Sequence, residues 1–421
     1  MIVTVFGLGF VGLTTSLGLA HLGHTVYGIE ADSRRLETLR TGILPFYEPH
    51  LDEELNIQRK QGRFILDGSI EQAVKNSEII FYCVGTPYGE DGAADLTALF
   101  EAVAQTLEAI HDDSFRVLVT KSTIPPSTTE RCVLPFVKEH LSHRTNLCVA
   151  NNPEFLREGY CWKDFMEADR IVIGCTDETG RRKLTELYKP LKKPIYCVSP
   201  STGEFVKYLS NTLLATLISY SNEMAQAAEI IGGIQIAQAF RILHMDKRWK
   251  NGEMASYAYP GCGYGGYCLP KDTCAFRAQA RKFGFEPAVL NAVIETNEHR
   301  SEKIAKWIVR DLDKAKSIGI AGLAFKPDSD DVRDSPARRI IEQLQGMGFR
   351  RILVYDPIAM RQFQQSAPDL DVIYCESLEE LCSRSERIAI TTAWPEFALL
   401  MQWTGGQVVD CRYMLWGSGH D

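Results

Sequence analysis

The stretch Gly7-Leu8-Gly9-Phe10-Val11-Gly12 decides the fold of the first half of the chain. It follows a short apolar run, Ile2 to Phe6, and opens a segment with helical character, Phe10 to His21. A second apolar run, Thr25 to Ile29, leads to Glu30, which comes 18 residues after the stretch ends. Strand, glycines, helix, strand and acid in this order predict a Rossmann unit that binds a dinucleotide.

The charged residues after the second strand bear on which dinucleotide binds. The Glu30 carboxylate is placed to hold the adenosine ribose hydroxyls and would repel a 2′-phosphate, which favours NAD over NADP. Arg34 and Arg35 follow closely. These two arginines either contact a phosphate of the ligand or lie on a solvated helix face, and the sequence leaves both alternatives open.

Composition limits the class of protein. With 421 residues, 45% of them hydrophobic, the chain is expected to form more than one domain. The net charge of -8, without a block of lysine and arginine, argues against nucleic acid as a partner. Neither a charged leader nor an apolar run of membrane-spanning length is found, so we expect a cytoplasmic protein without a membrane partner. The 12 cysteines lack paired spacing, which predicts neither a disulfide framework nor a metal site.

The pattern of an apolar run followed by a loop continues through the first half of the chain. The runs are Glu78 to Val84, Arg116 to Lys121 and Leu147 to Ala150. This alternation predicts a doubly wound parallel sheet, in which ligands bind at the carboxyl ends of the strands. Thr86, Ser122 and Thr123 are therefore placed to meet a ligand, although such residues are also common in ordinary turns.

Two carboxylates follow the third of these runs. Glu154 and Glu158 lie four residues apart, so in a helical turn they would share a face. Their place after a strand end favours a functional role over an exposed acidic surface.

A long helix is predicted from Gly203 to Ile231, which Gly232 and Gly233 end. It would span roughly 43 Å at 1.5 Å per residue. Because apolar residues occur on more than one side, we expect it to be buried between domains or between the subunits of a homodimer. Lys207 and Asn211 share one face; either a polar substrate satisfies them, or Lys207 extends to solvent.

One cysteine stands out in Gly261-Cys262-Gly263-Tyr264-Gly265-Gly266-Tyr267-Cys268-Leu269-Pro270-Lys271-Asp272. Pro270 suits the first position of a helix that runs from Lys271 to Phe283. A helix N-terminus and a neighbouring cation favour a thiolate, so Cys268 is a candidate nucleophile. The alternative is an inert buried cysteine behind a flexible loop.

The last third of the chain repeats the α/β alternation. Strands are predicted at Ser317 to Ala321, Arg351 to Tyr355, Arg387 to Thr392 and Gln407 to Val409. Ser335 and Pro336 begin a helix that ends at about Gly346. The fold class is therefore α/β, with two Rossmann-like doubly wound domains joined by a long central helix. The expected regions are 1–200 for NAD binding, 201–312 for dimerisation and the cysteine loop, and 313–421 as a second Rossmann-like domain.

Several of these motifs together resemble the UDP-glucose 6-dehydrogenases of the UDP-glucose/GDP-mannose dehydrogenase family. The motifs are Gly7 to Gly12, Val84 to Pro87, Lys121 to Pro125, Asn152 to Gly159, Lys207 to Asn211, Gly263 to Asp272, and Phe325 to Lys326. Tyr267 before the cysteine favours UDP-glucose over UDP-N-acetylhexosamines and GDP-mannose. The resemblance implies a four-electron oxidation with two NAD molecules through a Cys268 thiohemiacetal and thioester. The alternatives are another nucleotide-sugar 6-dehydrogenase, a two-electron hydroxyacid dehydrogenase and a catalytically silent NAD-binding protein.

The resemblance also implies that 313–421 binds the UDP-sugar, and it implies roles for individual residues. The catalytic set is Cys268, Lys207, Asp272, Asn211, Glu154 and Thr123. The expected NAD contacts are Gly7, Gly9, Phe10, Val11, Gly12, Glu30, Arg35, Val84, Thr86, Pro87, Ser122, Thr123, Glu158, Lys271 and Arg333. The expected substrate contacts are Glu154, Phe155, Leu156, Arg157, Glu158, Lys207, Asn211, Arg248, Tyr259, Tyr264, Gly265, Phe325, Lys326 and Arg412. Cys262 and Cys411 depart from the family pattern, and the segment after Arg248 is about four residues longer than the pattern.

Overall fold

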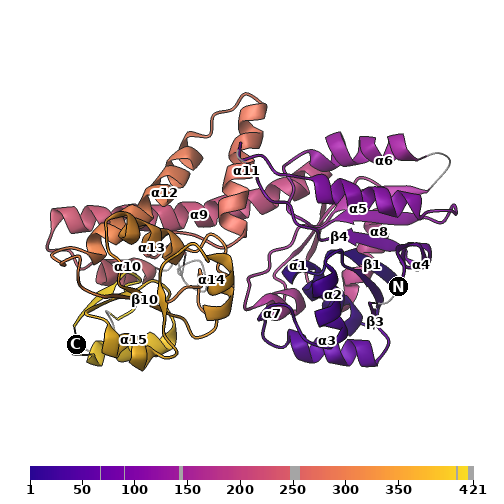
Figure 1. The fold of residues 1–421 in the computed structure, drawn as a ribbon. Coiled ribbons are helices and arrows are strands. Elements are labelled where there is room, and N and C mark those ends of the chain that lie inside the picture. The colour runs from indigo at the N-terminus through magenta and orange to yellow at the C-terminus, as the bar shows by residue number, and fades with distance from the viewer. Residues whose placement is uncertain (67, 90, 142–145, 247–256, 404–405, 416–421) are drawn as a thin grey trace. The chain divides into compact units, whose positions relative to one another are not determined.

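The computed structural model describes residues 1–66, 68–89, 91–141, 146–246, 257–403 and 406–415. The chain divides into two compact units, Met1–Leu209 and Ser210–Asp421 (Figure 1). Each unit has its own sheet and its own hydrophobic core. The α/β class expected from the alternating pattern is confirmed.

The first unit contains an eight-stranded sheet in the order β3-β2-β1-β4-β5-β6-β7-β8. Neighbouring strands run parallel except for β6 and β7, which meet in an antiparallel bridge. The strands are β1 (Ile2–Phe6), β2 (Thr25–Ile29), β3 (Phe64–Ile65), β4 (Ile79–Tyr82), β5 (Arg116–Thr120), β6 (Leu147–Asn151), β7 (Ile171–Gly174) and β8 (Ile195–Val198).

Helices cover both faces of this sheet because its strands are apolar on both sides. Alternate residues point to opposite faces, so Val117 packs in one core cluster and Leu118 in the other. Figure 1 shows α5 and α6 on one side of the sheet and α1 and α3 on the other. The helices are α1 (Phe10–His21), α2 (Ser33–Arg40), α3 (Leu51–Lys60), α4 (Ile70–Asn76), α5 (Thr97–Glu108), η1 (Thr129–Val133), α6 (Leu134–His140), α7 (Cys161–Met166), α8 (Glu178–Tyr188) and η2 (Lys189–Leu191).

The second unit repeats the strand order of the first. Its sheet runs β11-β10-β9-β12-β13 with every pair parallel, matching β3-β2-β1-β4-β5 position by position. The strands are β9 (Ile318–Ala321), β10 (Ile352–Tyr355), β11 (Ile373–Tyr374), β12 (Arg387–Ile390) and β13 (Gln407–Asp410). The helices are α10 (Ile236–His244), α11 (Cys268–Lys282), α12 (Ala288–Ile308), α13 (Pro336–Gly346), α14 (Met360–Ser366), α15 (Leu378–Arg384) and η5 (Pro395–Gln402).

The long helix α9 (Pro200–Ile231) starts in the first unit and continues into the second. It begins three residues before the predicted start and ends, as predicted, at Gly232, whose φ of 77° is left-handed. Several of its apolar side chains are exposed to solvent in the single chain, including Leu213 at 49% and Tyr220 at 52%. Among the described residues, α9 included, no helix combines the length and the apolar character needed to cross a membrane.

Candidate active site

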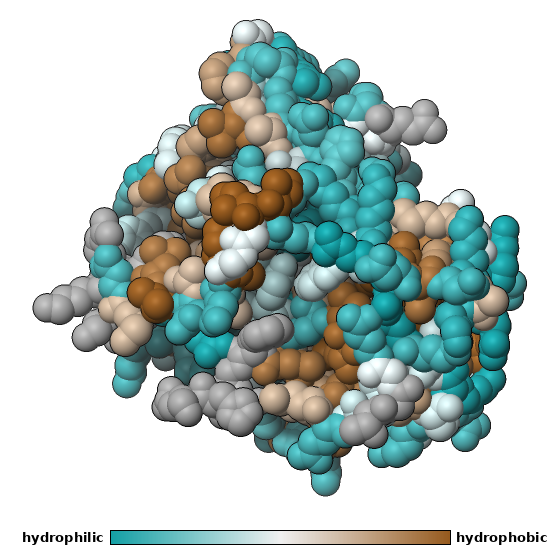
Figure 2. Space-filling view, turned by 90° about the vertical axis from the view of Figure 1, so that its left-hand side faces the viewer, coloured by the Kyte–Doolittle hydropathy of each residue, from teal (hydrophilic) through white to brown (hydrophobic). Residues whose placement is uncertain are grey.

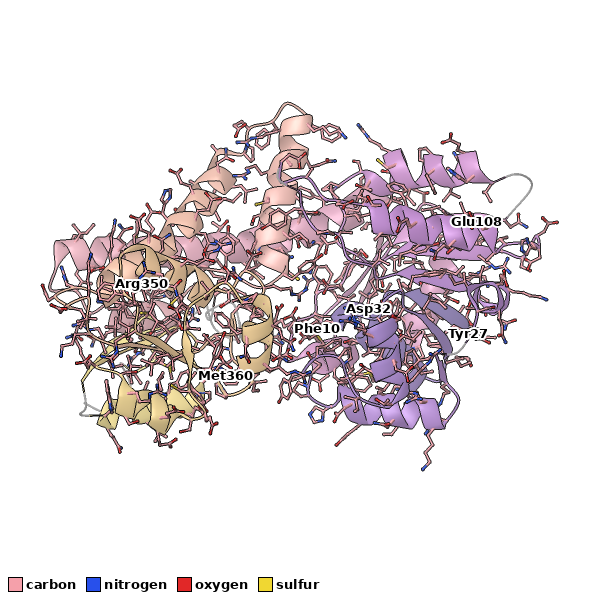
Figure 3. The ribbon with its side chains drawn as sticks, viewed as in Figure 1. Phe10, Tyr27, Asp32, Glu108, Arg350 and Met360 are labelled. Atoms are coloured by element: carbon pink, nitrogen blue, oxygen red, sulfur yellow. The ribbon has the colours of Figure 1, made fainter. Side chains whose placement is uncertain are left out.

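The loop between β1 and α1 is shaped by contacts that only glycine permits. Gly7 has a φ of 84°, and its N–H donates to the carbonyl of Ile29 at 2.8 Å. A Cβ on Gly12 would lie 1.7 Å from the Gly7 carbonyl oxygen, whereas a Cβ on Gly9 would meet no atom within 4 Å. Phe10 begins α1 at this point (Figure 3). Open space at Gly9, beside a helix N-terminus, fits a pyrophosphate group.

The glycines predict two different outcomes for the same substitution. Gly12→Ala should destabilise the protein by about 2 kcal/mol or more, because its methyl group would collide with backbone rather than with a movable side chain. Gly9→Ala, the matched control, should change the stability of the cofactor-free protein by less than about 0.5 kcal/mol. It should nevertheless weaken NADH binding, since the methyl group occupies the open space. Thermal unfolding and NADH fluorescence titration measure the two effects, and equal losses of stability would contradict this account of the loop.

The acid predicted for the ribose lies at the carboxyl end of β2 and is held in place. Glu30 Oε2 accepts hydrogen bonds from the Leu8 N–H at 2.9 Å and from Arg35 Nη1 at 3.1 Å. Its other oxygen accepts the Asp32 N–H at 2.9 Å, and Asp32 in turn caps α2 (Figure 3). Glu30 and Arg35, both predicted to contact NAD, therefore lie together beside the glycine loop.

Hydrogen bonds join the loops after β4 and β5, and they are made by the residues predicted at those strand ends. Ser122 Oγ donates to the Val84 carbonyl at 2.6 Å. Thr86 Oγ1 donates to the Thr123 carbonyl at 2.9 Å. The first unit thus brings these four residues together at the carboxyl edge of its sheet.

A buried ion pair joins the start of α9 to the loop after β6. Lys207 Nζ lies 2.8 Å from Glu154 Oε1, and the two residues are only 4% and 7% exposed. The alternative in which Lys207 extends to solvent is therefore wrong. Burial raises the pKa of Glu154, but Lys207, the Leu156 N–H and Lys121 together outweigh burial and hold that pKa below its usual value.

Lys121 is a second buried cation near Glu154, and no role was predicted for it. Its Nζ donates to Asn152 Oδ1 at 2.9 Å, and Tyr188 Oη donates to the same oxygen at 2.6 Å. Burial lowers the pKa of Lys121 to about 8, with Lys207 acting in the same direction and Glu154 opposing it. The available signal was a lysine at the carboxyl end of β5 (Arg116–Thr120), which was interpreted as the last strand residue.

The segment after Glu154 is not helical, so the prediction that Glu154 and Glu158 share a helical face is wrong. Glu154 Oε2 instead accepts the Leu156 N–H at 2.6 Å, which closes a local turn. Arg157 pairs with Asp164 of α7 at 2.6 Å. Carboxylate hydrogen bonds, rather than helix bonds, hold this loop.

In the second unit, Cys268 is the first residue of α11 and is half-buried. The helix starts three residues before the predicted Lys271, so Pro270 is its third residue rather than its first. A proline is tolerated there because the first N–H groups of a helix have no partner within the helix. The expected placement of Cys268 at a helix N-terminus holds.

Three buried polar side chains accompany the cysteine in the second unit. Asp272 Oδ1 lies 2.5 Å from Lys271 Nζ, and Asp272 Oδ2 accepts a hydrogen bond from Asn211 Nδ2 at 2.5 Å. Burial lowers the pKa of Lys271, but the negative charges of Asp272 and Cys268 outweigh it and raise that pKa above its ordinary value. Lys271 therefore keeps its positive charge in the neutral pH range, beside Asp272 and Cys268.

Close contacts fix the glycine loop that precedes Cys268. A Cβ on Gly265 would lie 2.5 Å from the Asp334 carbonyl oxygen, and one on Gly266 would lie 2.9 Å from the Phe325 ring. The Arg333 guanidinium lies 4.5 Å from the centre of the Tyr267 ring. The loop is therefore held by the residues that follow β9.

The two cysteines that depart from the family pattern lie together. Cys262 Sγ lies 3.8 Å from the Cys411 carbonyl oxygen, and both side chains are buried in one core cluster. A Cβ on Gly261 would lie 2.3 Å from Arg412 Nη1, so Arg412 rests against the same loop.

The remaining predicted substrate contacts have different outcomes. Tyr259 Oη donates to the Tyr413 carbonyl at 3.1 Å, Tyr264 is buried, and Lys326 Nζ lies 5.8 Å from the centre of the neighbouring Phe325 ring. Arg248 lies outside the described residues.

Comparison with family models places three consecutive matches along the chain. Residues 1–192 match the NAD binding domain of the UDP-glucose/GDP-mannose dehydrogenase family. Residues 201–299 match the central domain of that family, and residues 319–416 match its UDP binding domain.

Individual relatives resemble the chain over nearly its whole length. A UDP-glucose 6-dehydrogenase of Bacillus subtilis is 36% identical over 94% of this chain and 88% of the relative. One of Rickettsia bellii is 34% identical over 95% of this chain and 91% of the relative. Among solved structures, a UDP-glucose dehydrogenase from Pyrobaculum islandicum aligns with a TM-score of 0.92 and 37% identity, covering 98% of this chain and 94% of that one. A UDP-D-ManNAc dehydrogenase from Pyrococcus horikoshii aligns with a TM-score of 0.85 and 26% identity, covering 98% and 96%.

Proposed function

The chain belongs to the UDP-glucose/GDP-mannose dehydrogenase family, and from this membership we propose that it oxidises UDP-glucose to UDP-glucuronate with two molecules of NAD⁺. The relatives named UDP-glucose 6-dehydrogenase support this choice of sugar, as does Tyr267 before the cysteine. The observation that carries the proposal is the surroundings of Cys268. A half-buried thiol at a helix N-terminus, with Lys271 and Asp272 in the next turn, suits covalent catalysis.

The first oxidation converts the primary alcohol of the sugar to an aldehyde and releases a hydride and a proton. When bound, NAD⁺ accepts the hydride of each oxidation. We assign the proton transfer to Lys207 Nζ and the Asp272 carboxylate, while Asn211 orients the sugar oxygen through its amide. The hydrogen bond from Asn211 to Asp272 supports a shared role for this pair.

The second oxidation needs Cys268 because an aldehyde cannot release a hydride until a nucleophile has added to its carbonyl carbon. The thiolate adds to the aldehyde carbon while its oxygen gains a proton, which gives a thiohemiacetal. Loss of a hydride and a proton from this adduct gives a thioester. Water then attacks the acyl carbon, the carbon–sulfur bond breaks, and the acid and the thiol are released. We assign assistance of the hydrolysis to Glu154 and the holding of the water to Thr123, which the position of Glu154 beside Lys207 supports.

The contacts with cofactor and substrate are proposed residue by residue. The open space at Gly9, the Glu30 carboxylate and the cross-linked loops at Thr86 and Ser122 support NAD as the cofactor. Lys326 and Arg412 are proposed to hold the nucleotide sugar. The regions 1–200, 201–312 and 313–421 are proposed as the NAD-binding, central and sugar-nucleotide-binding parts, a division that the family-model boundaries support.

We also propose that the protein works as a cytoplasmic homodimer. In the second unit, large apolar side chains of α9 and α10 are exposed, among them Ile230 at 78%, Ile231 at 73% and Ile242 at 61%. Figure 2 shows apolar side chains gathered on the face of this unit that is turned toward the viewer. In the part of the chain that the structure describes, which includes all 12 cysteines, none is joined in a disulfide, and this suits a reducing compartment.

Cofactor stoichiometry tests the proposed function. With limiting UDP-glucose and excess NAD⁺, two NADH should form per sugar nucleotide, and UDP-glucuronate should be the product. UDP-N-acetylglucosamine, UDP-N-acetylmannosamine and GDP-mannose serve as controls and should react much more slowly. A yield of one NADH would favour a two-electron dehydrogenase, and no turnover of any sugar nucleotide would favour a silent NAD-binding protein.

A further inference from the structure

A buried acid, Glu204, lies at the start of α9 and has no role in the reaction described above. It is 3% exposed and belongs to the part of α9 that lies in the first unit. The preceding Gly203 packs closely against the sheet, because a Cβ there would lie 2.3 Å from Asn151 Oδ1 and 3.2 Å from Gly174 Cα. Glu204 is therefore enclosed where α9 meets the ends of β6 and β7.

The Glu204 carboxylate holds the N-terminal end of η1. Its Oε1 accepts the Thr129 N–H at 2.7 Å, and Thr129 is the first residue of η1, which continues directly into α6. A carboxylate at this end satisfies an N–H without a partner in the helix and complements the helix dipole. Ser201, one turn earlier on α9, donates through Oγ to the Glu130 carboxylate, and its Oγ lies 3.1 Å from Ser127 Oγ. Ser127 has a left-handed φ of 73°, so α9 holds a backbone conformation that serine rarely adopts.

These contacts join two parts of the proposed site. The segment that Glu204 holds continues the loop after β5, which carries Ser122 and Thr123. Three residues after Glu204 on α9 lies Lys207, whose Nζ pairs with Glu154 at 2.8 Å. A shift of α9 against the loop would therefore move Lys207 relative to Thr123.

The charge on Glu204 changes in the neutral pH range. Burial raises its pKa to about 7, although hydrogen bonds from Thr129 and Ser127 oppose this. Glu130 on η1 is the charged neighbour that contributes, and its negative charge raises the pKa further. Asn151 and Ser201, from the other packed elements, carry no charge. Within the described residues, Glu204 Oε2 is buried without a hydrogen-bond partner, so no donor stabilises a negative charge on this oxygen.

We propose that Glu204 is a positioning residue whose ionised carboxylate fixes the loop after β5 against the turn of α9 that carries Lys207. The ionised form accepts the Thr129 N–H more strongly than the neutral form, so the arrangement is tightest above neutral pH. The expected effect on turnover rests on the proposed function. The ionisation of Glu204 does not depend on that function.

The pH profile of kcat tests the positioning role in the full-length protein with UDP-glucose and NAD⁺. For the wild type, kcat should fall roughly two- to fivefold from pH 8 to pH 6, as a single ionisation near 7 produces when the neutral form keeps part of the activity. Glu204→Gln should remove this ionisation and lower kcat at pH 8 by roughly three- to tenfold, because a neutral amide oxygen is a weaker acceptor. Glu130→Gln is the matched control: it should keep the ionisation but move it to lower pH, since it removes a charge that raises the Glu204 pKa.

A measurement without turnover keeps the proposal testable if the activity is absent. Between about pH 4.3 and 7 the folded chain keeps a proton on Glu204 that the unfolded chain has released, so this group lowers stability as pH rises through that window. The Tm of Glu204→Gln relative to wild type should therefore increase from pH 5 to pH 7.5. A Tm difference independent of pH would overturn the ionisation. If the wild type is active and Glu204→Gln has the same kcat and the same pH profile, the positioning role is overturned. If the wild type is inactive, only the proposed function is overturned.

Discussion

Replacing Cys268 with serine is expected to lower the steady-state formation of UDP-glucuronate by on the order of 10³-fold or more. A serine hydroxyl at this helix N-terminus is much harder to ionise than a thiol, so the covalent adduct of the aldehyde does not form. Hydride transfer from the alcohol does not need the thiol. The variant should therefore still produce NADH in a single turnover, at no more than one NADH per sugar nucleotide. Rapid-mixing absorbance at 340 nm and chromatography of the products measure both quantities.

Cys274→Ser supplies the matched control for this prediction. Cys274 lies on the same helix, α11, and is also half-buried, but it is six residues further along the helix than Cys268. Its replacement should leave two NADH per UDP-glucose. Two NADH per sugar from the Cys268 variant would falsify the covalent mechanism.

Replacing Lys207 with methionine is expected to cost both activity and stability. Turnover should fall by about 10²- to 10⁴-fold, the usual effect of losing a positioned proton-transfer group. The substitution also leaves the Glu154 carboxylate buried without its partner at 2.8 Å. Breaking such a pair costs about 3–5 kcal/mol, and the lower end applies here because Lys121 still contributes to Glu154. Chemical denaturation and initial rates measure the two losses.

The pH dependence and a double variant separate the charge effect from a packing effect. Without Lys207, burial should raise the pKa of Glu154 above its value in the unfolded chain, so the stability deficit should grow from pH 5 to pH 8. Lys207→Met combined with Glu154→Gln removes both charges and should recover most of the lost stability but none of the activity. A deficit that is independent of pH and persists in the double variant would show that lost packing, not the unpaired charge, is responsible.

Much of the fold could be predicted because its signals are local. Gly12 has no space for a side chain beside Gly7, and this constraint acts within six residues of sequence. The strand–helix–strand order around it is set by the same short-range pattern. The helix predicted from Pro336 to about Gly346 was confirmed, and its start was predictable because Ser335 caps it and Pro336 begins it.

The candidate site was predicted less completely because its charges meet through the tertiary fold. Lys207 was weighed as a solvated side chain, because an isolated lysine near a helix start usually extends to solvent and its partner Glu154 lies 53 residues earlier in the sequence. Glu154 and Glu158 were expected to share one face of a helical turn, and that turn does not form. No role was predicted for Lys121, because it was interpreted only as the last residue of a strand.

The sequence by itself determined the glycine loop, the two α/β units and the position of Cys268 at a helix N-terminus, because sterics and periodicity act between residues close along the chain. The tertiary structure alone decided which buried charges are compensated. It brings Lys207 to Glu154, and it brings the Glu204 carboxylate to an N–H 75 residues away in the sequence. The reason is that an ionisable group keeps or loses its charge according to the burial and the partners that the folded chain gives it.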